Sequence, residues 1–318
     1  MNLQKIRYTT KNLLEHKTRM LRIFLRSIDG VHNTAAILNR LVGRIYESYF
    51  MPSRMGMYRA LLEAASANSY HMLSVLDFYR LTQAGGFDTG NRYIILRHDI
   101  DTDPATAREF WKIERDLGAT ASHYFRLCTL DLGLMEEIEK SGSEASYHYE
   151  EIATVAKEDC LRTRNEIMKV LPRIRQRFIE NYRWLRRVAR LPLRSVASHG
   201  DFANRKLLIA NAEILKDQNL RSELGIELEA YDDTAQHHIS SRHSDDMPPR
   251  RWNPGSPFEA IQQGLPVIYL LTHPRHFRAH LTQNLSSDLR RLYEGVCYDH
   301  GICSQHRIMR RAIGDDDR

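Results

Sequence analysis

Short apolar runs alternate with helix-like segments from residue 93 to near the end of the chain. The runs are rich in apolar residues and end at polar or glycine positions, and they predict strands at 93–99, 119–127, 143–149, 194–199, 225–231 and 266–271. The segments between them carry apolar residues at helical spacing and predict helices at 104–117, 131–141, 157–189, 204–216 and 281–294. Repeated strand-then-helix units favour an α/β fold with parallel strands, built as a deformed or partial barrel.

The part of the chain before the first of these strands has a mainly helical pattern. Residues 57–84 predict two helices, and the glycine-rich stretch 85–90 separates them from the strand. Residues 3–50 alternate leucine and isoleucine with lysine and arginine at roughly helical spacing. We therefore expect a basic helical segment, 1–56, followed by an α/β barrel domain, 57–318.

The net charge of +6 comes from the N-terminal segment. Residues 1–50 hold 9 lysines and arginines against 3 acids, and the other 37 basic and 37 acidic residues cancel. A basic amphipathic helix either lies on an anionic membrane surface or packs on its own domain with a solvated basic face. The arginine-rich stretch 173–194 has apolar residues at helical spacing, which favours a helix with a charged outer face over a nucleic-acid surface. We expect no nucleic-acid partner.

The sequence predicts a cytoplasmic protein. The chain has neither a run of about 20 apolar residues nor a secretory signal at its start. Its four cysteines lack metal-binding spacing and are expected to be free thiols: Cys128, Cys160, Cys297 and Cys303. Contact of residues 1–50 with the inner membrane is compatible with this location.

Two carboxylates one residue apart follow the strand at 93–99. Asp99 and Asp101 point the same way if the strand continues through them, so both can converge on one small volume. Converging carboxylates repel unless a cation or a shared proton offsets their charge, which favours a metal site or an acid/base site. The other interpretation is helix capping, since Thr102, Asp103 and Pro104 follow.

Histidines or acids stand at the ends of four other predicted strands. These ends carry His148, His199, the Asp232-Asp233 pair and His273. The carboxyl ends of parallel strands meet at one edge of a sheet, and this shared position favours a common site over scattered structural histidines. Imidazole and carboxylate together suit Zn²⁺ or another borderline divalent ion.

Five motifs follow one another along the chain. They are Arg97 to Asp101, Gly142 to Glu150, Ser198-His199-Gly200, Asp233-Thr234 with Arg250-Arg251-Trp252, and Thr272-His273-Pro274. In this order they resemble the polysaccharide deacetylase (NodB-homology) superfamily, and more closely the deacetylase-like proteins of bacterial O-antigen and surface-polysaccharide gene clusters. The resemblance covers about residues 57–280. Each motif alone is weakly specific, and it is their order that carries the resemblance.

The resemblance implies a role for each matching residue. Asp99 corresponds to the general base, Asp101 to a metal ligand and His273 to the acid that protonates the leaving amine. His148 matches the family's metal-binding histidine motif. Candidate substrate-binding residues are Arg97, Glu151, Arg251 and Trp252, with an ion pair as the alternative role of both arginines.

The chain departs from the family at one ligand. The superfamily places a second histidine four residues after the first, and here that position is Ile152, which cannot bind a metal. His199 is the first candidate to replace it, and Glu151 is the second. The third possibility is that the fold remains and hydrolysis is lost.

The expected function is therefore metal-dependent removal of an acetyl group from an N-acetylated sugar, with zinc as the expected ion. The substrate would be a nucleotide-linked or lipid-linked sugar of surface-polysaccharide metabolism. The alternative is a catalytically degenerate barrel that binds glycan or a biosynthetic partner. The sequence leaves the oligomeric state open.

Overall fold

The computed structural model describes residues 31–245 and 251–303. The chain divides into two compact units, 1–46 and 47–318, and the second carries the α/β fold. The helix α2 (Val31–Tyr49) agrees with the expected N-terminal helix, whose first part, 3–30, lies outside the described residues. No helix within the described ranges is long and apolar enough to cross a membrane.

One mostly parallel sheet forms the centre of the second unit. Its strands in the described residues are β1 (Tyr70–Ser74), β2 (Arg92–Ile100), β3 (Ser122–Phe125), β4 (Glu144–Tyr149), β5 (Ser195–Ser198), β6 (Leu228–Glu229), β7 (Ser241–Asp245), β8 (Trp252–Asn253) and β9 (Val267–Thr272). The order is β6-β5-β4-β3-β2-β9-β7-β8, and only the β7–β8 pair is antiparallel. Strand β1 pairs with the first half of β2, and β3 pairs with the second half.

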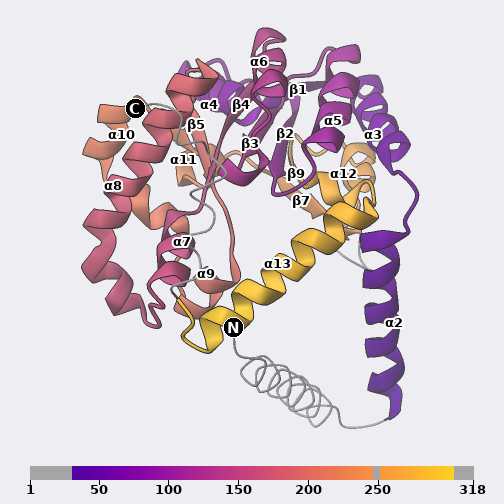
Figure 1. The fold of residues 1–318 in the computed structure, drawn as a ribbon. Helices are drawn as coiled ribbons and strands as arrows, with labels where there is room; N and C mark the ends of the chain where they lie inside the picture. The colour runs from indigo at the N-terminus through magenta and orange to yellow at the C-terminus, as the bar shows by residue number, and fades with distance from the viewer. Residues whose placement is uncertain (1–30, 246–250, 304–318) are drawn as a thin grey trace. The chain divides into compact units, whose positions relative to one another are not determined.

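Most helices follow a strand in the chain, and helices flank the sheet (Figure 1). They are α3 (Met55–Ala67), α4 (Val75–Gln83), α5 (Pro104–Asp116), α6 (Leu132–Lys140), α7 (Glu151–Glu158), α8 (Arg164–Ala189), α9 (Phe202–Leu207), α10 (Gln218–Leu224), α11 (Asp233–Gln236), α12 (Pro257–Gln262) and α13 (Leu281–Asp299). The start of α5 shows how the sequence sets such a boundary. Asp103 accepts a hydrogen bond from the Thr106 amide, and Pro104 occupies the first turn.

The sheet curls around its own inner face. One cluster of buried side chains joins residues from β2, β3, β5, β6 and β9 on that face. The Arg97 guanidinium on β2 lies 4.4 Å from the ring centroid of Tyr231, just after β6, although three strands separate β2 from β6 in the sheet. Among the described strands no pairing joins β6 to β8, so the architecture shown is an α/β fold with a curled, mostly parallel sheet.

The central strand β2 is buried along almost its whole length. Every residue from Tyr93 to Ile100 is buried, which explains the continuous apolar run in the sequence. Its parallel neighbours β3 and β9 end at the same edge, and β4 and β5 follow beyond β3. The carboxyl ends of these strands therefore bring their polar residues together.

Several elements differ from the sequence prediction. Strand β1 was expected as part of a helix, because Met72, Leu73 and Leu76 keep helical apolar spacing. Strands β7 and β8 lie between the expected strands 225–231 and 266–271, where the apolar pattern predicts no strand, and the expected strand 225–231 is paired only at Leu228–Glu229. The expected helix 157–189 is divided between α7 and α8. Strand β7 was missed because its sequence, Ser-Arg-His-Ser-Asp, carries no apolar residue.

The expectation of four free thiols is wrong for one pair. Cys160 and Cys303 form a disulfide, with their Cα atoms 5.5 Å apart, while Cys128 and Cys297 are free. The two bonded residues are 143 positions apart, and nothing in their sequence spacing indicates the pairing. The expectation of a cytoplasmic location loses the support that it drew from free cysteines.

Candidate metal centre and its flanking pairs

Three side chains from three strand ends converge on one point. Asp101 follows β2, His148 lies in β4, and His199 follows β5. Asp101 Oδ1 lies 2.9 Å from His199 Nδ1 and 3.3 Å from His148 Nε2, and the two ring nitrogens are 3.3 Å apart. Both histidines are buried and Asp101 is half-buried, so this group, the Asp101 cluster, could hold a metal ion.

The hydrogen bonds around the Asp101 cluster fit a bound cation. The ring nitrogen His148 Nδ1 lies 3.0 Å from the Ala197 carbonyl oxygen and donates to it, which leaves Nε2 with a free lone pair facing the cluster. The buried atom Asp101 Oδ1 has no hydrogen bond of acceptable geometry among the described residues. Tetrahedral zinc with bonds of about 2.0–2.2 Å separates its ligand atoms by about 3.3 Å, close to the distances found here.

The charge of Asp101 is stabilised by its neighbours. Burial opposes the charged form, but His199 and His148 outweigh burial and hold the pKa of Asp101 well below its usual range. Asp101 therefore remains a carboxylate, the form that binds a metal.

Asp99 lies beside the cluster and is held by Arg97. Two hydrogen bonds join the guanidinium to the carboxylate, at 2.7 and 2.9 Å, and Asp99 Oδ2 lies 3.5 Å from His148 Nε2. Burial raises the pKa of Asp99, but Arg97 outweighs it and lowers the pKa below the usual value. Arg97 itself has no exposed surface, so it orients a carboxylate, the second of its two expected roles, and cannot touch a substrate.

His273 follows β9 and is fixed by a residue that the sequence did not reveal. Its Nδ1 lies 2.7 Å from Asp245 Oδ1, and its backbone amide donates to Asp245 Oδ2 at 2.6 Å. Burial lowers the pKa of His273, but Asp245, Asp101 and Asp99 raise it to about 10. Asp245 also lies 3.2 Å from His276 Nδ1. Like the other site residues, Asp245 stands at the end of a strand, but β7 has no apolar residue and the sequence does not predict it.

Three further residues were expected to bind substrate, and the structure shows two of them buried and one exposed. Glu151 is buried and accepts hydrogen bonds from Tyr147 and Asn181, so its Oε1 is not available to a metal or a sugar. Trp252 is buried in the core against Phe277 and is therefore a packing residue. Arg251 is exposed.

An ion pair that the sequence did not predict, Arg126–Glu150, borders the Asp101 cluster. Arg126, after β3, donates to both carboxylate oxygens of Glu150 and also to the Asp101 carbonyl oxygen at 3.3 Å. Glu150, His199 and Asp201 are also close enough to share an ion, but Glu150 is paired with Arg126 and Asp201 with Lys157. The Asp101 cluster has no such competing cation at its carboxylate oxygens in the described structure.

Comparison of the chain with protein-family models, with curated proteins and with solved structures finds no match.

Proposed function

We propose that this protein is a metal-dependent hydrolase that removes the acetyl group from an N-acetylated sugar. The observation that carries the proposal is the spacing of Asp101 Oδ1, His148 Nε2 and His199 Nδ1, at 2.9–3.3 Å from one another. His199 takes the place of the histidine expected at Ile152. Asp99 and His273 stand beside this cluster with opposite charges, which is the arrangement that acid/base hydrolysis of an amide needs.

Two residues of the chain transfer protons in the proposed reaction, Asp99 as the base and His273 as the acid. When bound, a zinc ion would polarise the acetyl carbonyl and lower the pKa of water. Asp99, kept ionised by Arg97, accepts the proton that water loses as its oxygen forms a bond to the acetyl carbon. His273, protonated with a pKa of about 10, donates a proton to the amide nitrogen as the C–N bond breaks. The products are acetate and the free amine.

Asp245 determines which atom of His273 donates. Because Nδ1 is bonded to Asp245 Oδ1, the proton at Nε2 is the one left for the leaving group. The same carboxylate balances the positive charge of the imidazolium. The Asp245–His273 pair is therefore built for a general acid, and the Arg97–Asp99 pair for a general base.

The alternative, a degenerate barrel that only binds glycan or a partner, drew its support from the missing histidine at position 152. That reason weakens because His199 presents an imidazole nitrogen 2.9 Å from Asp101 Oδ1. The Arg97–Asp99 and Asp245–His273 pairs beside the cluster also favour acid/base chemistry over glycan binding alone.

The wider setting belongs to the same proposal. The substrate would be a nucleotide-linked or lipid-linked N-acetyl sugar of bacterial surface-polysaccharide synthesis. The proposal also includes a deformed barrel, a cytoplasmic location, and contact of residues 1–50 with the inner membrane.

The test is a metal-dependent acetate assay. The protein is freed of metal with a chelator, reloaded with Zn²⁺, and incubated with UDP-N-acetylglucosamine and with an N-acetylglucosaminyl lipid diphosphate. We expect acetate release only after reloading, and Asp99→Asn should lower kcat by about 10²–10⁴-fold with its zinc retained.

The matched control is Asp116→Asn, which removes one exposed carboxylate paired with Arg59 and should leave kcat unchanged. If the zinc-loaded wild type releases acetate from neither compound, or if Asp99→Asn retains full activity, the proposal is wrong.

A further inference from the structure

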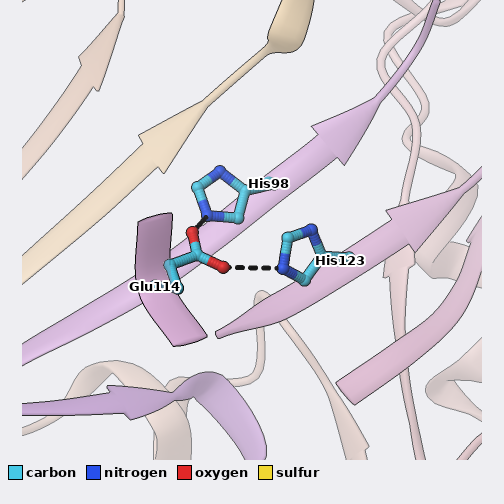
Figure 2. A group of neighbouring side chains, drawn as sticks. All are labelled: His98, Glu114 and His123. Atoms are coloured by element: carbon cyan, nitrogen blue, oxygen red, sulfur yellow. Dashed lines mark hydrogen bonds and ion pairs between the residues drawn. The ribbon is translucent and has the colours of Figure 1, made fainter. Parts of the chain in front are cut away.

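A second group of two histidines and one carboxylate lies on the opposite face of β2. Figure 2 shows the Glu114 carboxylate, from α5, between the rings of His98 on β2 and His123 on β3. Glu114 Oε1 lies 2.6 Å from His98 Nε2, and Glu114 Oε2 lies 3.0 Å from His123 Nε2. All three side chains are fully buried. We name this group the Glu114 cluster.

Two hydroxyl groups complete the cluster. Tyr58, from α3, donates to Glu114 Oε1 at 2.6 Å. On the other side of the ring, His98 Nδ1 lies 2.5 Å from the hydroxyl of Thr272, the last residue of β9. His98 therefore has a partner on each ring nitrogen, and it joins α5 to the end of β9.

The arrangement of the Glu114 cluster differs from that of the Asp101 cluster. In the Asp101 cluster the single atom Oδ1 faces both imidazole nitrogens, as ligands around one ion do. In the Glu114 cluster each carboxylate oxygen faces a different ring, Oε1 at 2.6 Å from His98 Nε2 and Oε2 at 3.0 Å from His123 Nε2, which is the arrangement of two separate hydrogen bonds. His123 adds a second argument, because its Nδ1 has no partner in the described structure. As a metal ligand through Nε2 it would bury an unpaired N–H, whereas as a donor to Glu114 it buries only an unpaired acceptor.

The charges agree with hydrogen bonding. Burial alone would raise the pKa of Glu114, but His98 and His123 outweigh it and hold that pKa far below the usual range. Burial lowers the pKa of His123, which favours the neutral ring that donates from Nε2. Burial and Glu114 raise the pKa of Tyr58, so its hydroxyl keeps its proton and donates. A carboxylate that accepts three hydrogen bonds is stable without a metal.

The Glu114 cluster lies directly behind the catalytic residues. His98 precedes Asp99 in β2, Thr272 precedes His273, and His98 and Thr272 are the last paired residues of the β2–β9 ladder. We propose that the Glu114 cluster is a metal-free clamp that fixes the ends of β2 and β9 through the His98–Thr272 contact and so positions Asp99 against His273. His98, Glu114 and Thr272 are thus positioning residues, and their role in catalysis rests on the proposed function.

The first test counts metal ions. Wild type reloaded with Zn²⁺ and freed of excess should hold one ion per chain, Glu114→Gln should also hold one, and Asp101→Asn should hold none. Two ions in the wild type and one in Glu114→Gln would make the Glu114 cluster a metal site and overturn the proposal. This count needs no activity, so it tests the clamp even if the proposed function fails.

The second test breaks only the contact between strands. Thr272→Val keeps the side-chain shape and removes the hydroxyl, and we expect kcat to fall about tenfold while KM and zinc content stay unchanged, because the two catalytic groups lose their alignment. Thr272→Ser restores the hydroxyl and should recover kcat. The control is Thr120→Val, which removes a hydroxyl just before β3 that donates to Asp77 and accepts from the Ser74 amide.

Amide hydrogen exchange tests the positioning role of the Glu114 cluster independently of catalytic activity. In Thr272→Val the amides of residues 98–101 should exchange faster than in wild type, with the rest of the sheet unchanged, whether or not the protein hydrolyses the compounds tested. Unchanged exchange at these amides, or a kcat as low in Thr120→Val as in Thr272→Val, would refute the positioning role.

Discussion

The replacement Asp245→Asn tests the general acid most sharply. The change keeps the size of the side chain and removes the negative charge bonded to His273 Nδ1. In the intact protein the pKa of His273 is about 10, against an ordinary value of 6.5. Without the carboxylate the pKa should fall toward 6.5, so the acid should lose its proton near neutral pH.

The size of the effect follows from the two pKa values. At pH 8 a histidine with a pKa of about 10 is ~99% protonated, and one with the ordinary pKa of 6.5 is ~3% protonated. We therefore expect kcat/KM of Asp245→Asn to fall about 30-fold at pH 8 and less than about threefold at pH 5.5. The alkaline limb of the pH profile should move down by about 3.5 units, the difference between the two pKa values.

The same shift affects stability with a definite sign. Because the pKa of His273 is higher in the folded protein than 6.5, the contribution of the pair is complete below that pH and is lost as the pH rises through about 10. Wild type and Asp245→Asn should therefore differ most in free energy of unfolding below pH 6.5 and converge in strong alkali.

The assay is kcat/KM for acetate release between pH 5 and 10 in zinc-loaded protein. Asp288→Asn is the control, because it removes a carboxylate that pairs with Arg275 and does not touch His273. A loss of activity that is equal at every pH would show that Asp245 only maintains the structure, and an unshifted alkaline limb would refute His273 as the acid.

Two further predictions concern stability. Arg97→Met should lower the free energy of unfolding at pH 7 by about 3–5 kcal/mol, because it leaves the buried carboxylate of Asp99 unpaired, whereas Arg59→Met at an exposed pair should have little effect; equal urea midpoints for the two variants would contradict this. Cys160→Ser opens a disulfide that spans 143 positions and should lower the free energy of unfolding by about 2–4 kcal/mol, as a reducing agent should in wild type but not in the variant. Cys128→Ser, at a free thiol, is its control, and no change in Cys160→Ser would mean that the disulfide does not form.

The elements with strong apolar patterns could be predicted from the sequence. Strands β2, β4 and β9 and helix α5 lie within a few residues of their expected ranges. Their buried positions carry apolar residues at strand or helix spacing, and this spacing can be recognised in the sequence. Strand β7 gave no such pattern. It is held by its ladder to β9, a long-range contact that local sequence does not encode.

The candidate site also contains residues that the sequence predicts and residues that it does not. The approach of Asp101, His148 and His199 followed from their positions at strand ends, because parallel strands end at one edge of the sheet. Asp245 was missed along with its strand. Trp252 and Glu151 were expected at the substrate and lie in the core, because a motif gives the order of residues and not the direction of their side chains.

The position of a bound metal tests the central claim most directly. Crystals of the zinc-loaded protein, measured at the zinc absorption edge, should show one anomalous peak within about 2.0–2.2 Å of Asp101 Oδ1, His148 Nε2 and His199 Nδ1. A map without a peak there, or with its peak between His98, Glu114 and His123 instead, would contradict the account.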